Sequence, residues 1–269
     1  MTGAALCTGA DSVAARFVAR TAPASPTILR LAQEDLQQLP IQELELLIAS
    51  DPEFSLRVLA LANSAFYSQQ HDVLTLRSAV VVLGIETISR LAASVWSRSL
   101  LTGPNPSDDT LWRHALATGI AAQMMAEAHR LANPQHCFVA GLLHDIGMCA
   151  IQADALGGTE VDAHAAVGAE IATLLGLAPG LATAILHHDD AEGAGESDAV
   201  NATVAAANQI TIRAGLCHDA ESESQDQILA AALERLGLEH EDSDAFLIGL
   251  ERRLDSFERA FGASSEVVS

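Results

Sequence analysis

Hydrophobic residues recur every three or four positions along most of the chain, which is the spacing of one face of an α-helix. The first clear stripe begins at residue 27, and further stripes follow as far as residue 261. We find no stretch of strict polar and apolar alternation, which a half-buried strand would show. The pattern therefore predicts an all-α fold.

Capping and turn residues divide this pattern into separate helices. Asp51-Pro52 predicts a capping residue followed by the first residue of a helix, and Gly84 predicts a helix end. The run 103–107 (Gly-Pro-Asn-Pro-Ser) is the strongest break in the chain. We predict helices over residues 86–100, 110–131, 135–151, 162–175, 179–188 and 199–215, followed by helices around 227–236 and 244–261.

Composition and charge narrow the class of protein. The chain has 269 residues, 49% of them hydrophobic and only 4% aromatic, which favours packed helices over sheets. The net charge is −21, and none of the basic residues is a lysine, so binding to nucleic acid or to an anionic membrane is disfavoured. The absence of lysine also excludes Schiff-base chemistry.

We predict a cytoplasmic location. No apolar run reaches the roughly 20 residues of a membrane span, and no basic segment followed by an apolar one begins the chain. The cysteines are scattered and fit a reducing compartment as small buried residues. They are Cys7, Cys137, Cys149 and Cys217.

One apolar run, Gly141–Gly147, contains a histidine and an aspartate side by side, His144 and Asp145. A buried carboxylate is costly unless it is paired or bound to a metal. The pair therefore belongs to a metal site or to a buried hydrogen-bond network, or it lies nearer the surface than its apolar neighbours indicate. Further polar residues fall on or beside apolar faces of other predicted helices, from which they could reach one pocket: His114, His164, His187, His188 and Asn208.

Neutral imidazoles with a shared carboxylate suit zinc, iron or manganese. Because adjacent residues point about 100° apart on a helix, we expect only one of His187 and His188 to reach a shared site. Each histidine has a structural alternative, as a hydrogen-bonded core residue or as a charge at a helix end.

The order of these residues along the chain resembles that of the metal ligands in the HD superfamily of metal phosphohydrolases. The sequence motifs around them resemble those of its HDOD (HD-related output domain) branch. The similar segments run from about residue 25 to residue 215. They are the run 48–54 with 59–66 ("DP…LLxxANSAFY" in the family), 79–84 ("AIxxLG"), 111–114 ("WxH"), 141–147 ("GLLHDIG") and 164–169 ("HxxVGA"). Residues 187–197 align loosely with the "HHExxDGxGYP" run of the HD-GYP phosphodiesterases, but Glu196-Ser197 replaces its Tyr-Pro.

The resemblance implies a module in which an N-terminal helical bundle packs on an HD-like helical bundle. It would comprise a loosely ordered segment 1–24, an N-terminal subdomain 25–105, an HD-like subdomain 106–215 and acidic C-terminal helices 216–269. The implied role is signal-transduction output through a protein partner, without catalysis. The alternatives are a metal-dependent phosphohydrolase acting on a nucleotide or cyclic dinucleotide, and a small-molecule sensor that uses the same pocket, for which a nucleotide is one possible ligand.

The resemblance also places metal ligands. His114, His144, Asp145, His164, His187 and His188 are the candidates, and Asn208 stands where the superfamily has its last acid. With Asp145 as the only carboxylate, one divalent metal (iron, manganese or zinc) balances the charge better than two. A site without metal stays open.

Overall fold

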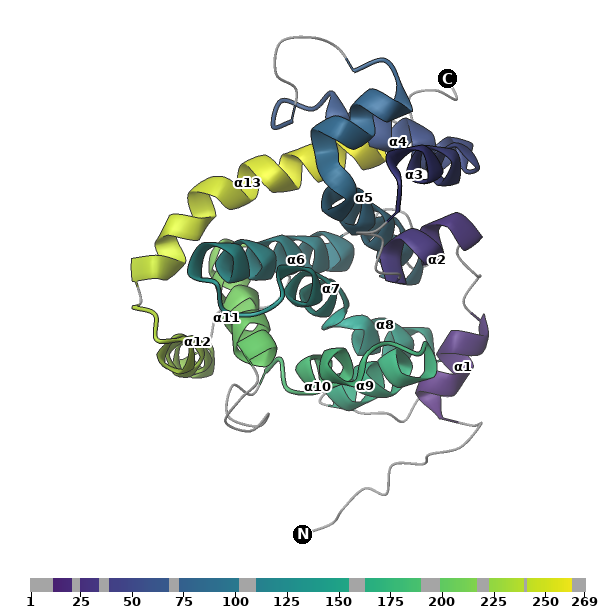
Figure 1. Cartoon of the computed structure of the whole chain (residues 1–269). Helices are drawn as coiled ribbons and strands as arrows, with labels where there is room; N and C mark the ends of the chain where they lie inside the picture. Colours follow the sequence, from purple (N-terminus) through teal and green to yellow (C-terminus); the bar gives the residue numbers. More distant parts are fainter. Residues whose placement is uncertain are drawn as a thin grey trace. The chain divides into compact units, whose positions relative to one another are not determined.

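The computed structural model describes residues 12–20, 25–33, 39–67, 73–101, 110–154, 163–189, 199–216, 223–239 and 241–262. Every regular element within these ranges is a helix (Figure 1), so the predicted all-α fold is confirmed. The boundaries predicted at residues 24 and 105 lie outside the described residues, as do Cys7 and Cys217.

The chain forms two compact units, and each consists of two separate stretches of sequence. Unit 1 contains residues 1–22 and 100–239, and unit 2 contains residues 23–99 and 240–269. All the candidate metal ligands belong to unit 1. The chain therefore passes from one unit to the other three times.

Unit 1 is built around two helices that touch backbone to backbone, α6 (Thr110–His129) and α7 (Pro134–Leu143). A Cβ atom on Gly141 would lie 2.9 Å from the Cα of Gly119, so only glycine allows this approach. Around them pack α8 (Ile146–Ala153), α9 (His164–Leu174), α10 (Pro179–Leu186), α11 (Ala199–Arg213) and α12 (Glu223–Leu236).

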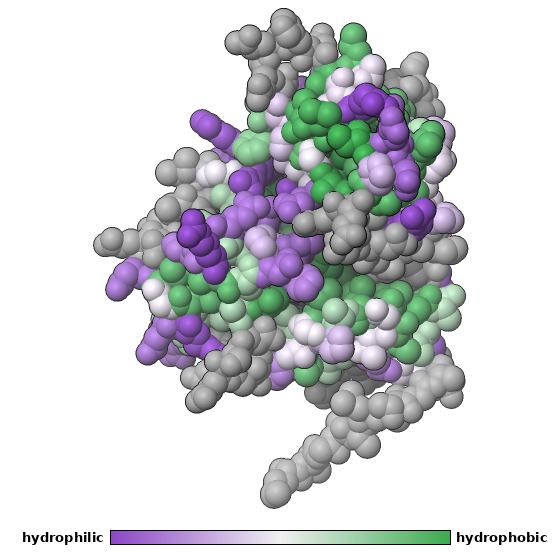
Figure 2. Space-filling model, in the orientation of Figure 1, coloured by the Kyte–Doolittle hydropathy of each residue, from purple (hydrophilic) through white to green (hydrophobic). Residues whose placement is uncertain are grey.

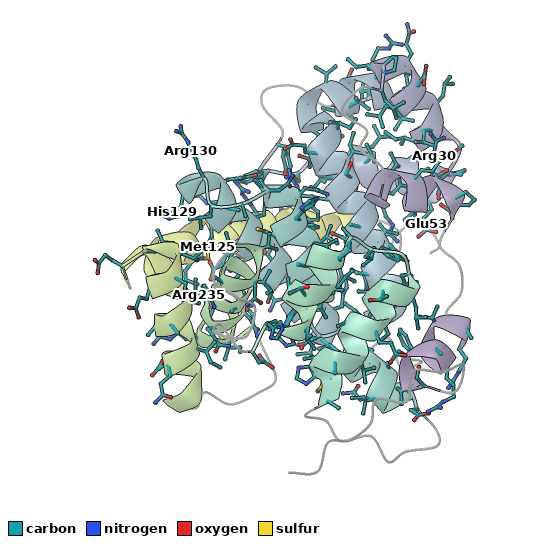
Figure 3. The ribbon with its side chains drawn as sticks, turned by 60° about the horizontal axis from the view of Figure 1, so that its bottom comes forward. Arg30, Glu53, Met125, His129, Arg130 and Arg235 are labelled. Carbon is teal, nitrogen blue, oxygen red and sulfur yellow. The ribbon has the colours of Figure 1, made fainter. Side chains whose placement is uncertain are left out.

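The end of α6 shows how sequence sets a helix boundary. Arg130 has a positive φ of 54°, and the amide of Leu131 donates to the carbonyl of Ala126, as in a Schellman C-cap. Figure 3 shows Arg130 projecting outward beyond His129. The predicted helix over 110–131 therefore ends two residues earlier.

A short N-terminal helix, α1 (Val13–Arg20), packs on α8 and α9 within unit 1. The Oγ of Ser12 donates to Glu170, and Arg16 makes two hydrogen bonds to Asp154 at 2.8 and 3.3 Å. These contacts attach α1 to α8, which follows Asp145, and to α9, which begins at His164.

The single helix predicted over residues 135–151 is wrong, because the chain turns at His144-Asp145 and continues as α8. Asp145 has φ and ψ of −97° and 12°, outside the helical region. The turn brings α8 so close to α9 that a Cβ on Gly147 would lie only 1.9 Å from the carbonyl oxygen of His164. Tertiary packing therefore breaks a helix that the hydrophobic pattern alone would continue.

Unit 2 contains α2 (Pro26–Gln33), α3 (Ile41–Ala49), α4 (Pro52–Ala62), nearly all of α5 (Leu76–Leu101) and α13 (Glu241–Gly262). Asp51 caps α4 as predicted, because its Oδ1 accepts from the amide of Phe54 at 3.0 Å. Gly84 has a φ of 72° and kinks α5, which explains the break predicted there.

The end of α13 is fastened to α4 by a buried arginine. The Arg57 guanidinium lies 3.4 Å from the carbonyl oxygens of Ala260 and Phe261 and pairs with Glu53 at 2.7 Å. It also lies 4.9 Å from the centre of the Phe261 ring. These carbonyls belong to the last turn of α13, where no helical partner remains for them.

Two helical stretches are long and apolar enough to cross a membrane, Leu76–Leu101 and Pro134–Ala153, with mean hydropathies of 1.5 and 1.2. However, 61% and 67% of their apolar windows are buried inside the protein. Core helices pass the same test, so this is weak support for a membrane span.

Candidate metal centre

The ends of several helices of unit 1 carry the candidate residues. His114 lies in the first turn and a half of α6, His144 follows the last residue of α7, and Asp145 precedes α8. His164 is the first residue of α9. His188 and Asp189 follow α10, and Asn208 lies on α11.

Four imidazoles surround the carboxylate of Asp145. Its Oδ2 lies 3.2 Å from the Nε2 of His144 and 3.7 Å from that of His114. Its Oδ1 lies 3.5 Å from the Nε2 of His188 and 3.7 Å from that of His164. Asp145 has the N-cap position of α8 but makes no capping hydrogen bond, so its carboxylate is available to the histidines.

Backbone carbonyls fix the orientation of two of these rings. The Nδ1 of His144 lies 2.7 Å from the Gly141 oxygen, and the Nδ1 of His188 lies 2.7 Å from the Ile185 oxygen. Each Nδ1 therefore carries a hydrogen and donates it, which leaves a lone pair on Nε2 in the neutral ring. Metal-binding histidines are commonly held in this way, by a hydrogen bond from the ring nitrogen that does not face the metal.

This orientation turns electron-rich atoms toward one another at the centre of the cluster. The lone pairs of His144 and His188 face the carboxylate oxygens of Asp145, and the Nε2 atoms of His164 and His188 lie 3.1 Å apart. Such electron-rich atoms repel one another unless protons or a metal ion lie between them. The Nε2 of His144 is buried and has no hydrogen-bond partner among the described residues. The donor set therefore fits a divalent metal such as zinc, iron or manganese.

Without metal, the cluster is stabilised by protons. Burial alone would raise the pKa of Asp145, but its interactions with His144 and His188 hold that pKa well below the usual range. Burial likewise opposes the charged form of His188, but the carboxylates of Asp145 and Asp189 raise its pKa to about 10. The contact with Asp189 also raises the pKa of His164.

These shifts predict how the stability of the metal-free protein depends on pH. The contribution of His188 is fully present below its unfolded pKa of 6.5 and is lost as the pH rises toward about 10. The contribution of Asp145 is present above 3.8 and is lost on acidification below that value. We expect chelator-treated protein to be most stable between about pH 4 and 6.5, and urea unfolding at pH 5.5 and 8.5 measures this.

Metal should reverse this trend, because metal competes with protons for the imidazoles and binds more tightly as the pH rises. The general repulsion among the acidic residues also makes the stability of the metal-free protein depend on pH. A His188→Gln variant separates the two contributions, because it should remove only the pH dependence that comes from His188. Metal-free stability that rises steadily from pH 5.5 to 8.5 would contradict the assigned orientation of the rings.

The structure adds one residue that the sequence reasoning missed, Asp189. Its Oδ2 lies 3.2 Å from the Nε2 of His188 and 3.3 Å from that of His164. The sequence feature that could have identified it is its position directly after the double histidine, where the HD-GYP run "HHE" has its glutamate. Asn208 contacts Asp189 through a hydrogen bond from its Nδ2 at 3.3 Å, and not the central carboxylate.

His187 is not brought into the cluster. It is the half-buried C-cap of α10 and does not belong to the groups of possible metal ligands among the described residues. Those groups are His114, His144 and Asp145, and Asp145, His164 and His188. Metal binding by them stays a prediction. The two cysteines that the structure describes, Cys137 and Cys149, are buried free thiols, and burial raises the pKa of Cys149 to about 12.

Comparison with known families agrees with the geometry. The sequence profile of the HDOD domain matches residues 23–156, and that of the HD domain matches residues 111–226. The chain thus belongs to the HDOD domain family, within the wider family of HD domains, and the resemblance inferred from its motifs is confirmed.

Solved structures with the same fold cover almost the whole chain. An HDOD domain protein of unknown function from Geobacter sulfurreducens has a TM-score of 0.67 at 25% identity, over 92% of this chain and 95% of that one. A candidate metal-dependent phosphohydrolase from Shewanella amazonensis SB2B has a TM-score of 0.62 at 22% identity, over 87% and 92%. A candidate signal transduction protein from Marinobacter aquaeolei VT8 has a TM-score of 0.66 at 20% identity, over 91% and 60%.

The last two likenesses show the fold alone. A search of curated proteins found no significant match.

Proposed function

We propose that this protein is a regulatory module of signal transduction whose unit 1 binds one divalent metal ion at the histidine cluster. The observation that carries the proposal is the convergence of four imidazole Nε2 atoms on the carboxylate of Asp145. Its ligands would come from Asp145, His114, His144, His164 and His188, whose donor atoms form two close groups that share Asp145. When bound, it supplies a centre of positive charge that polarises an oxygen ligand.

Several features support a role in signalling rather than metabolism. The chain is an HDOD protein, and a protein of the same fold is described as a candidate signal transduction protein. Unit 2 also exposes large apolar side chains that a protein partner could cover, with Leu46, Leu74 and Val81 exposed by 71%, 82% and 66%. Figure 2 shows apolar residues gathered over helices α3 to α5. We propose that the protein lies in the cytoplasm, acts through a protein partner of a signalling pathway, and binds neither nucleic acid nor membrane.

A second candidate is a metal-dependent phosphohydrolase. It is favoured by the arrangement around Asp145, in which each carboxylate oxygen faces a separate pair of imidazoles. A carboxylate that bridges two metals needs this arrangement, and two metals about 3.5–4 Å apart assist phosphodiester hydrolysis. A protein of this fold is described as a candidate metal-dependent phosphohydrolase.

Elemental analysis tests the proposal. Protein purified without an affinity tag should retain near-stoichiometric iron, manganese or zinc, and His144→Ala should retain none. His136→Ala is the matched control, because His136 is an exposed histidine in the first turn of α7 and should leave the metal content unchanged. Wild-type protein that holds no metal and cannot be reloaded with Mn²⁺ or Fe²⁺ would refute metal binding.

The loaded protein then distinguishes the two candidates. Turnover of bis(p-nitrophenyl) phosphate that disappears in His144→Ala would favour the phosphohydrolase. Bound metal without turnover of phosphoesters would favour the regulatory module.

A further inference from the structure

We propose that Asp189, held in place by Asn208, is the second carboxylate ligand of the metal centre. Members of the superfamily have an acid at the position of Asn208. In this chain, Asp189 would supply that acid from the turn after α10. This inference rests on the proposed metal-binding function and goes further, since it names a ligand and explains why an amide suffices on α11.

The distances around Asp189 are those expected of atoms that share one cation. Its Oδ2 and the Nε2 atoms of His164 and His188 form a triangle with sides of 3.1, 3.2 and 3.3 Å. Donor atoms that each lie about 2.1 Å from one metal are about 3.0–3.4 Å apart in octahedral or tetrahedral geometry. The triangle therefore matches one face of a coordination sphere. Asp145 Oδ1 lies 3.5 Å from the nearer of these nitrogens.

The charge balance supports the same conclusion. A divalent ion brings two positive charges into a site whose histidines are largely buried, and the Asp145 carboxylate cancels only one of them. An uncompensated charge in such a site is costly. Asp189 supplies the second negative charge, and one divalent ion with two carboxylates leaves the centre neutral.

Asn208 has the chemistry of a positioning residue. It is buried, with 4% of its surface exposed, and its Nδ2 donates to Asp189 Oδ1 at 3.3 Å. The amide nitrogen must face the carboxylate, since an amide oxygen there would repel it. One carboxylate oxygen is thus held by Asn208, and the other is directed at the imidazoles. Asp189 itself is 50% exposed, which places this side of the centre next to solvent.

An exchange of the two residues tests the proposal. Metal-free full-length protein is titrated with Mn²⁺ against a competing chelator, and circular dichroism confirms that each variant is folded. Asp189→Asn should weaken Mn²⁺ binding by about tenfold or more. The double variant Asp189→Asn/Asn208→Asp keeps the net charge and an amide-carboxylate pair, and it should regain most of the lost affinity.

Glu234→Gln is the control for net charge, because Glu234 is an exposed acid on α12 of the same unit. It should bind Mn²⁺ as the wild type does. Asp189→Asn that binds as tightly as the wild type would overturn the proposal and leave the metal-binding function intact. A double variant as weak as Asp189→Asn would also overturn it, because the carboxylate would then not be transferable to position 208. Wild-type protein that binds no Mn²⁺ would refute the proposed function itself.

Discussion

Replacing Asp145 by asparagine is expected to abolish metal binding and to destabilise the metal-free protein. The substitution keeps the size of the side chain but removes the charge that four imidazoles share. Removing one partner of a buried ion pair costs about 3 kcal/mol, because the other charge stays buried without compensation. Urea unfolding and elemental analysis of the variant measure the two effects.

The loss of stability should depend on pH in a defined direction. The pKa of His188 is raised to about 10, so its pairing with Asp145 is fully present below the unfolded pKa of 6.5 and fades above it. The destabilisation should therefore be largest near pH 5.5 and smaller at pH 9. Asp226→Asn is a suitable control, since this exposed acid pairs with Arg213 at the surface and should cost no more than about 1 kcal/mol. Equal effects of the two variants would contradict a charged cluster around Asp145.

Gly147→Ala should be the most damaging of the small substitutions in unit 1. The added methyl group would lie 1.9 Å from the His164 oxygen and 2.8 Å from the Gly168 nitrogen, and both of these are backbone atoms. A side chain could rotate away from such a clash, but backbone atoms cannot, so α8 and α9 would have to move apart. We expect a loss of about 3 kcal/mol, at the upper end for overpacking. Because α8 begins after Asp145 and α9 begins at His164, metal affinity should also fall by about tenfold or more.

Other glycines of the same unit provide a graded control. A Cβ on Gly168 would meet the side chain of Ile185 at 3.0 Å, and one on Gly180 would meet nothing within 4 Å. Alanine at position 168 should therefore cost less than at 147, and alanine at 180 should be neutral or stabilise α10 by up to about 1 kcal/mol. Chemical denaturation gives the order. A Gly147→Ala variant as stable as Gly180→Ala would show that α8 and α9 can separate freely.

Much of the fold could be predicted because it depends on local chemistry. The helical spacing of apolar residues, the cap at Asp51 and the break at Gly84 are properties of short segments, and the structure bears them out. The turn at His144-Asp145 could not be predicted in this way. The residues around it are apolar enough to continue a helix, and the chain turns there because α8 must approach α9 at Gly147.

The sequence reasoning identified the histidines and the first acid of the candidate site, but it did not identify Asp189. His114, His144, His164 and His188 could be singled out because histidines among apolar residues need partners. Asp189 lies at the start of an acidic stretch, where a carboxylate is ordinarily a solvated surface group, and only its contacts distinguish it. The choice of His188 over His187 likewise depends on where α10 ends, which differs by two residues from the predicted boundary.

The interleaving of the two units has a consequence for how the protein is made. Helix α13 is translated only after the whole of residues 100–239, yet it belongs to the same unit as residues 23–99. Until α13 arrives, Arg57 has no carbonyls of Ala260 and Phe261 to hold, and the surface of α4 that packs against α13 stays uncovered. Domains commonly fold one after another during synthesis, the N-terminal one first. Here residues 23–99 must wait until residues 100–239 have been made, so unit 2 cannot be completed before the larger part of unit 1 has been translated.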